Sequence, residues 1–476
     1  MDLPNVLLIM TDQQKATASH IHGNPFCETA SLERLAKDGV LYTRAFTPHP
    51  LCVPARVSLW TSQYPHRHGC RTNESLMPPG ALHAARLWKE TGYHLGLIGK
   101  NHCFERVEDL ALFDTWCEIS HDGLPENPAC RGMDWFRPLE GIQATHAIRR
   151  NMPRLNRHFS YAVTRFPLED YSTGLIAGQT VRFLEKHRND PFVLWVSFPD
   201  PHGPWQVPEE YAALFPPERI QLPPWREDEF NDGTAPERNV VLHRMMGIQD
   251  DVPEQVYGLL GAYYGNVRFI DDALGQILDA LDQLDLRRST IVIFCSDHGD
   301  FMGEHQLQAK GGVFYDCLTR VPLILSWPGQ VPAGAKEENL VSLIDVIPSL
   351  LYLQGIQVPK QMQGRPLPAI TGELENEIVF SEYGAGGPPF RLSDLKQMPE
   401  PYGRREFLQT LRWREAEGLR KMVRSRRWKY VHDPLGDKDE LYDLENDPWE
   451  LVNLAADPRY REITMEMYTH LSGRGL

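Results

Sequence analysis

Short apolar runs alternate with amphipathic stretches over the first 368 residues of the chain. This alternation is typical of a mostly parallel sheet whose two faces are covered by helices. Runs of strand length that are apolar almost throughout predict buried strands. The predicted strands cover residues 5–10, 93–98, 192–198, 290–295 and 322–326. The pattern therefore indicates an α/β domain with a large, mostly parallel sheet sandwiched by helices.

Two helices stand out in this domain. A helix that begins near Ser31 is expected to end at Asp38, where Gly39 can supply a left-handed cap. Residues 256–284 carry apolar side chains three and four positions apart, which predicts a long helix packed against the sheet. Its neighbouring Asp271 and Asp272 could be paired catalytic carboxylates, but we expect them on the solvated face of that helix.

Two long stretches of this domain, residues 103–170 and 204–250, are rich in Pro, Trp, Arg and His and lack a clean period. We expect them to form long loops at the mouth of the sheet, where such segments shape access to a site.

A second, smaller α+β domain is expected over residues 369–476. Residues 377–383 and 427–432 read as short antiparallel strands, and residues 458–471 read as a terminal helix. A basic run over residues 404–427 could contact an anionic ligand, although charge runs are usually solvated faces.

Composition excludes some classes of function. The chain has 476 residues, 42% of them hydrophobic, and a formal net charge of -15, whereas proteins that track nucleic-acid phosphates carry surplus cations. Apolar runs are too short for a helix that spans a membrane. Because the first residues show no basic leader, we expect a cytoplasmic protein. The chain has eight cysteines and no CxxC pair, so we expect free thiols rather than disulfides or a zinc site.

Polar side chains follow four of the predicted strands. In an open parallel sheet, ligands bind beyond the carboxyl ends of the strands. One such residue alone would be an ordinary cap or loop residue, but the whole set indicates a single site. The set consists of Asp12, Gln13, Lys100, His102, His202, Asp297 and His298.

The residue types at this edge indicate a metal and an anion. Carboxylate, amide and imidazole ligands from Asp12, Gln13, Asp297 and His298 suit one divalent cation such as Ca²⁺ or Mn²⁺ better than structural zinc. The cationic donors Lys100, His102, His202 and, in LQAKGG, Lys310 would surround a tetrahedral oxyanion beside that metal.

The run CVPAR adds a nucleophile to this picture. Cys52, Pro54 and Arg56 form a CxPxR pattern at the expected start of a helix, where Pro is tolerated and the helix dipole favours an anion. A cysteine here could be a buried thiol. It could also be a thiolate nucleophile of the cysteine-hydrolase type, but that mechanism needs one nearby His and no metal.

With these motifs in place, the sequence resembles the formylglycine-dependent sulfatases of the alkaline phosphatase superfamily. The resemblance covers nearly the whole chain. It runs through NVLLIMTDQQ, CVPAR, LIGKNH, FPDPHGP, SDHGDFMGEH, RVPLILSWPG and ELYDLENDPWELVNL.

The resemblance implies a role for each site residue. Cys52 would be oxidised to Cα-formylglycine, whose hydrate is the nucleophile, by a formylglycine-generating or anaerobic sulfatase-maturating enzyme. The metal shell would be Asp12, Gln13, Asp297, His298 and modified Cys52, with Arg56 holding the formylglycine. Lys100, His202 and Lys310 would bind sulfate, His102 would assist the hydrate, and Asn73 would reach the leaving group.

Three functions remain open on this resemblance. The first is hydrolysis of a sulfate monoester of a small molecule. The second is hydrolysis of a phosphonate monoester or phosphodiester by the same nucleophile, because Gln13 and His298 resemble that branch of the superfamily. The third is a sulfatase-like binding module that never acquires formylglycine.

Overall fold

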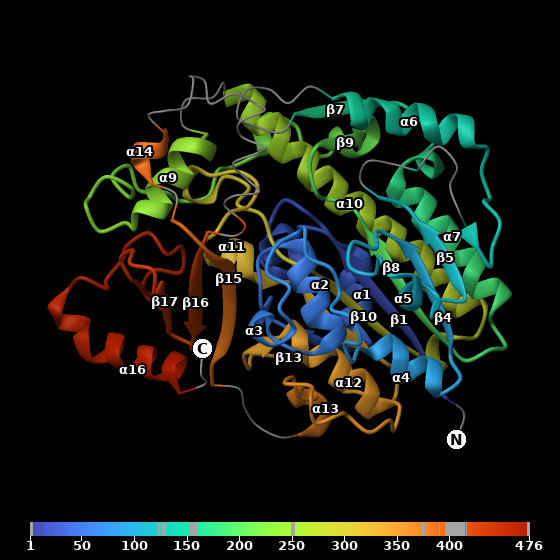
Figure 1. The fold of residues 1–476 in the computed structure, drawn as a ribbon. Helices are drawn as coiled ribbons and strands as arrows, with labels where there is room; N and C mark the ends of the chain where they lie inside the picture. Colours follow the sequence, from blue (N-terminus) through green and yellow to red (C-terminus); the bar gives the residue numbers. More distant parts are fainter. Residues whose placement is uncertain are drawn as a thin grey trace.

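The computed structural model describes residues 3–120, 124, 130–152, 160–248, 253–372, 377–389, 391–395, 415 and 417–473 (Figure 1). The predicted α/β sheet is confirmed, and it has nine strands. Their order is β13 (Ala335–Glu337), β2 (Gly39–Tyr42), β12 (Leu323–Ser326), β10 (Thr290–Ser296), β1 (Asn5–Thr11), β8 (Phe192–Phe198), β4 (His94–Gly99), β5 (Thr115–Glu118) and β6 (Cys130–Arg131).

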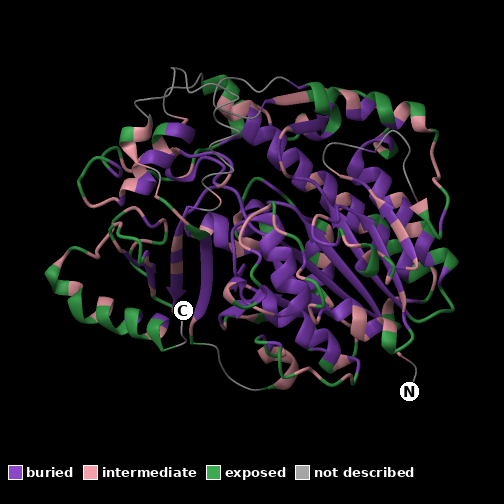
Figure 2. Cartoon of the chain, viewed as in Figure 1, coloured by how far each residue is buried: buried purple, intermediate pink, exposed green. Residues whose placement is uncertain are grey.

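The centre of the sheet is parallel. Strands β10, β1, β8, β4 and β5 run in one direction, whereas β12 is antiparallel to both of its neighbours and β6 is antiparallel to β5. Every residue of β1, β8 and β10 is buried, which explains why these runs are apolar throughout rather than alternating (Figure 2).

Helices cover both faces of the sheet. On one face, α1 (Ala30–Lys37), α7 (Ser172–Lys186) and α10 (Pro253–Gln283) pack against the odd-numbered residues of β1. On the other face, α2 (Cys52–Thr61), α4 (Ala84–Glu90) and α12 (Val346–Leu353) pack against its even-numbered residues. The long helix predicted for residues 256–284 is therefore confirmed as α10.

A separate antiparallel sheet follows near the carboxyl end of the chain. Its strands are β15 (Val379–Gly387), β16 (Gly418–Arg424), β17 (Trp428–His432) and β18 (Glu440–Asp443), and α16 (Arg461–Ser472) packs on it. This matches the predicted smaller α+β unit, although β16 was not expected. The domain boundary at residue 368 stays a prediction.

The two segments expected as long loops contain short elements where they are described. These are α5 (Val107–Leu110), β5, β6, α6 (Leu139–Asn151), β7 (Tyr161–Thr164), β9 (Trp205–Pro208), α8 (Glu209–Ala212) and α9 (Glu237–Met246). Most have only two to four residues, too few to produce a visible hydrophobic period.

The remaining elements are short. Strands β11 (Arg320–Val321), β3 (Ala45–Phe46) and β14 (Val341–Ser342) form a three-stranded sheet, and β7 pairs with β9. The other short helices are α3 (Pro65–His68), α11 (Asp316–Thr319), α13 (Pro368–Thr371) and α14 (Leu392–Leu395). Within the described ranges, no helix is long and apolar enough to cross a bilayer.

The expectation of eight free thiols is wrong for one pair. Cys117 and Cys130 form a disulfide, because β5 and β6 place them directly opposite each other with their Cα atoms 4.5 Å apart. Their separation of 13 residues in sequence gave no sign of this antiparallel pairing. The other six cysteines are free and buried.

The expected left-handed cap at Gly39 is also wrong. Gly39 begins β2 and pairs with Ser326 of β12. A Cβ atom at this position would lie 2.2 Å from the carbonyl oxygen of Leu325, so glycine is required here by close strand contact rather than by a positive φ.

The basic run is solvated only in part: Arg426 and Arg427 are exposed, whereas two other arginines of the run are not. Arg420 and Arg424 lie on β16, and both are buried. Arg424 pairs with Asp316 at 3.1 Å, and Arg427 pairs with Asp443 at 2.7 Å. Residues 404–414 lie outside the described residues.

Asp271 is not on a solvated face either. It is only 2% exposed, and its two carboxylate oxygens accept hydrogen bonds from the backbone N–H groups of Ser31 and Leu32, both at 2.9 Å. Burial raises the pKa of this carboxyl group to about 6. The side chain of Thr29, the N-cap residue, makes no capping hydrogen bond. Asp271 of α10 therefore takes the place of a side-chain cap for α1.

This cap gives the first prediction. Asp271→Ala should lower the free energy of unfolding by about 1–2 kcal/mol, because two buried N–H groups lose their acceptor. Asp271→Asn keeps one acceptor oxygen and should cost less. Asp279→Ala on the same helix removes only an exposed contact to Arg34 and serves as the control. Denaturant unfolding measures all three, and equal losses for Asp271→Ala and Asp279→Ala would contradict the capping role.

Candidate functional site

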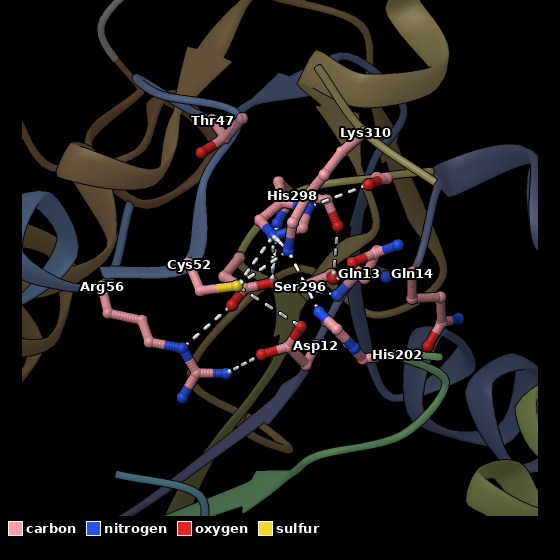
Figure 3. Close-up of polar contacts among 12 residues, drawn as sticks. Asp12, Gln13, Gln14, Thr47, Cys52, Arg56, His202, Ser296, His298 and Lys310 are labelled. Carbon is pink, nitrogen blue, oxygen red and sulfur yellow. Dashed lines mark hydrogen bonds and ion pairs between the residues drawn. The ribbon is translucent and has the colours of Figure 1, made fainter. Parts of the chain in front are cut away.

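The side chains predicted from the strand ends do converge. Asp12 follows β1, and the loop after β8 carries His202 (Figure 3). Asp297 follows β10, and Lys100 follows β4. Helix α2 begins at Cys52 and brings its first turn to this edge of the sheet. Residues from five elements therefore share one buried site.

Arg56 lies at the base of the site and is fully buried. Its Nη2 donates to Asp12 Oδ2 at 3.0 Å, and its Nε donates to Asp297 Oδ2 at 2.9 Å. Its Nη1 reaches Ser197 Oγ at 2.8 Å and the carbonyl oxygen of Lys100 at 3.1 Å. One guanidinium group thus links the carboxyl ends of β1, β10, β8 and β4, and its fixed fork suits two carboxylates better than an ammonium would.

Four groups in the site have the chemistry of metal ligands. Potential ligand atoms of Asp12, Cys52, Asp297 and His298 all lie within 4.8 Å of one another, and all four residues are buried. His298 Nδ1 donates to the carbonyl oxygen of Gly299 at 2.8 Å, so in the neutral ring Nε2 is the nitrogen able to coordinate a metal.

Gln13 completes this set from the adjacent position. Its Nε2 donates to Asp300, whereas its Oε1 is buried and has no hydrogen-bond partner among the residues that the structure describes. A buried amide oxygen without a donor is costly unless a ligand uses it. Two carboxylates, an amide oxygen and an imidazole fit a divalent cation that prefers oxygen ligands.

Lysine and histidine side chains also lie around Cys52. Lys310 Nζ lies 3.0 Å from Cys52 Sγ, 3.2 Å from His202 Nε2 and 3.2 Å from His298 Nε2. Lys100 Nζ lies 2.5 Å from Asp12 Oδ2. Lys310 and His202, which are 108 positions apart in sequence, therefore lie side by side at Cys52. This is the convergence expected of residues beyond the carboxyl ends of parallel strands.

The electrostatics of the site favour an anion at Cys52. Burial acts to raise the pKa of the Cys52 thiol, but Lys310, Lys100 and His298 together hold it well below its ordinary value. Burial and Cys52 act to raise the pKa of Asp12, yet Lys100, His202 and Arg56 lower it overall. Burial opposes the charge on Lys310, whereas Cys52 and Asp12 raise its pKa.

Two other predicted residues occupy less direct positions. His102 has a left-handed φ of 61° and hydrogen-bonds Cys52, which contributes to the low pKa of that thiol. Asn73 Oδ1 accepts the backbone N–H of Val53 at 3.1 Å, and its Nδ2 donates to Glu415 at 2.9 Å. Asn73 therefore caps the first turn of α2, and its predicted contact with a leaving group stays a prediction.

Several residues that support the site were not anticipated. Asp300, three residues after Asp297, orients the Gln13 amide; it lies within SDHGD, so its proximity to the metal ligands was a usable signal. Arg149 on α6 donates to Asp200 at 2.8 Å and to the carbonyl oxygen of His202 at 2.7 Å, which fixes the loop after β8. Nothing in the sequence marked Arg149 or Glu415.

Known proteins resemble this chain over nearly its whole length. An arylsulfatase from Clostridium perfringens is 26% identical, with 96% of this chain and 92% of the relative covered. A choline-sulfatase from Rhizobium meliloti is 28% identical, with 96% and 83% covered. The solved structure of a phosphonate monoester hydrolase of Agrobacterium radiobacter has a TM-score of 0.77 and 25% identity, with 99% and 95% covered.

The model of the sulfatase family matches residues 4–356. That match includes the candidate site residues from Asp12 to Lys310, and it spans well over half of the sequence. The chain therefore belongs to the sulfatase family.

Proposed function

We propose that this sulfatase hydrolyses the sulfate monoester of a small molecule, with the oxidised side chain of residue 52 as nucleophile and one divalent cation, Ca²⁺ or Mn²⁺, beside it. Hydrolysis of sulfuric esters is the activity of the family. The observation that carries the mechanism is the position of Cys52 Sγ, which lies at the start of α2 within 3.0 Å of Lys310 Nζ and 3.2 Å of His298 Nε2.

The residues around Cys52 fit both groups that the mechanism needs. Asp12, Gln13, Asp297 and His298 would hold the cation. Hydrated formylglycine has two hydroxyl groups, one to attack sulfur and one to expel sulfate as the carbonyl re-forms, and a bound cation would lower the pKa of the attacking hydroxyl. Cys52 Sγ occupies the place of those oxygen atoms.

The chain's own side chains then account for binding and proton transfer. In this proposal Lys100, Lys310 and His202 bind the sulfate oxygens, where preorganised donors stabilise charge that develops in the transition state. The leaving oxygen needs a proton, and both His202 and Lys310 are candidate donors. Arg56 pairs with both Asp12 and Asp297 and holds the two carboxylates at fixed positions.

A phosphonate monoester or phosphodiester hydrolase is the second candidate. The resemblance in fold to the phosphonate monoester hydrolase supports it, as do Gln13 and His298 in the candidate metal shell. Both substrates present a tetrahedral anion to the same donors, so turnover rather than geometry separates the two functions.

Maturation would require a formylglycine-generating or anaerobic sulfatase-maturating enzyme as partner. A cytoplasmic location stays a prediction, which fractionation of the source cells would test.

The substrate class is tested with Cys52 variants. Wild-type protein from a host with a maturating enzyme should turn over aryl sulfates faster than matched aryl phosphonates or phosphodiesters. Cys52→Ala should abolish turnover without lowering thermal stability. Cys52→Ser can attack but has no second hydroxyl, so it should stop after one turnover with sulfate held on the introduced hydroxyl group. Faster turnover of phosphonates would favour the second candidate, and an active Cys52→Ala would exclude the nucleophile.

Metal binding is tested at Asp297. Asp297→Asn removes one of two formal negative charges among the proposed protein ligands, so affinity for Mn²⁺ should fall roughly tenfold or more. Calorimetric titration of the metal-free protein measures this directly, and thermal melting checks the fold because Asp297 also pairs with Arg56. Asp279→Asn, at an exposed position of α10, is the matched control. Unchanged Mn²⁺ affinity in Asp297→Asn would contradict the assignment.

The shared anion site is tested with His202 and Lys310. Replacing either by Ala should lower kcat about a hundredfold, because each donor faces the same developing charge. In the double variant, the fold-loss in kcat should be smaller than the product of the two single fold-losses, since both side chains act on one transition state. Multiplicative losses would mean that they serve separate steps. Lys336→Ala, on the edge strand β13, should leave kcat unchanged.

A further inference from the structure

The segment that carries Lys310 is held at both of its ends. The carbonyl oxygen of Ala309 accepts the backbone N–H of Phe301 at 2.9 Å, which ties it to the loop after β10. The carbonyl oxygen of Gly312 accepts a hydrogen bond from Arg420 Nη1 at 2.7 Å. Arg420 lies on β16, so the second anchor comes from the C-terminal sheet.

Arg420 is itself fixed in place. It is 1% exposed, and its guanidinium group lies 3.0 Å from Glu417 Oε1 and 3.3 Å from Asp433 Oδ2. The same group lies over the ring of Tyr383, 5.7 Å from its centroid. A buried guanidinium with two carboxylate partners and an aromatic face cannot shift without losing several contacts.

The contact at Gly312 leaves no spare room. A Cβ atom on Gly312 would lie 2.2 Å from Arg420 Nη1 and 2.7 Å from the ring of Tyr383. The backbone of the Lys310 segment therefore rests directly on two side chains of the C-terminal sheet.

The same sheet also contacts the helix of the nucleophile. Leu51, the residue before Cys52, packs in one buried cluster with Phe314, Tyr383, Met422 and Val431. The ring of Tyr383 also stacks on His49 at 5.2 Å. Tyr383 and its neighbours thus connect the start of α2 with the loop that carries Lys310.

We propose that Arg420 is a positioning residue that sets the place of Lys310 relative to residue 52 through the carbonyl group of Gly312. The inference rests on the proposed function, in which Lys310 is a donor to the sulfate ester. Lysine has a long, flexible side chain, so the backbone from which it starts decides how precisely its ammonium group is placed. A displacement of about 1 Å at a reacting group can lower a rate about a hundredfold.

Arg420→Met tests this role, because it keeps much of the buried volume but removes the donor to Gly312. With nitrophenyl sulfate and phenyl sulfate as substrates, it should lower kcat roughly tenfold or more and change KM little, as expected when a transition-state contact is lost. The ratio of the two rates should shift in the same direction as in Lys310→Ala. Arg420→Lys retains a charged donor and should restore part of the loss.

A double-mutant cycle decides whether the effect passes through Lys310. In the Lys310→Ala background, Arg420→Met should cause little further loss. Gly312→Ala presses on the same contact without removing the cationic partner of Glu417 and Asp433, so it should give the same signature even if Arg420→Met is unstable. Arg424→Met is the matched control: it removes a buried arginine from the same strand and should lower stability without changing the rate ratio.

Two results would overturn the inference. The first is an equal loss of kcat from Arg420→Met in the wild-type and Lys310→Ala backgrounds. The second is a reduced kcat in Lys310→Ala together with wild-type kcat in both Arg420→Met and Gly312→Ala. If Lys310→Ala itself turns over at the wild-type rate, the proposed function loses this donor, and the inference falls with it.

Discussion

The buried contact of Arg56 with Asp12 and Asp297 is the constraint on which the site depends. Two buried carboxylates at neighbouring strand ends are costly to desolvate, and here one buried guanidinium group pairs with both of them. Removal of one partner from such a group leaves an uncompensated buried charge and costs about 3–5 kcal/mol in other proteins. Arg56 takes Oδ2 of each carboxylate, so Asp12 Oδ1 faces Cys52 Sγ at 3.7 Å, and Asp297 Oδ1 accepts the backbone N–H groups of Gln13 and His298 beside the same potential metal ligands.

Around this pair of carboxylates the chain arranges positive charge. Lys100 and Lys310 come from two loops, and the amino end of α2 adds its own partial positive charge, whereas burial and Lys310 lower the pKa of the neighbouring His202. A tetrahedral anion bound among these groups would relieve their mutual repulsion. The smaller C-terminal unit contributes to this arrangement from outside, through Arg420 of β16 at the Lys310 loop and through Glu415 at Asn73, the residue that caps α2. The smaller unit therefore supports the geometry of the site and does not merely cover it.

Much of this architecture could be predicted from the sequence because it depends on local patterns. Apolar runs identified the central strands, the topology of parallel sheets placed Asp12 and Asp297 at one edge, and CVPAR placed Cys52 at the start of a helix. Contacts that depend on distant partners could not be predicted. Asp271 was expected on the surface of α10, and only the position of α1 makes it a cap. Cys117 and Cys130 are neighbours only because β5 pairs with β6. Strand β16 was not predicted, because its buried arginines look like a solvated charge run in the sequence.

Whether the thiol at residue 52 is only the precursor of the nucleophile is the central question for this chain. The most direct measurement compares preparations made with graded amounts of a maturating enzyme. In each preparation, peptide mass spectrometry gives the fraction of residue 52 converted to formylglycine, and steady-state kinetics gives kcat for an aryl sulfate. The account predicts that kcat rises in proportion to the converted fraction and extrapolates to zero for the thiol form. Full activity in a preparation that contains only unmodified Cys52 would contradict it.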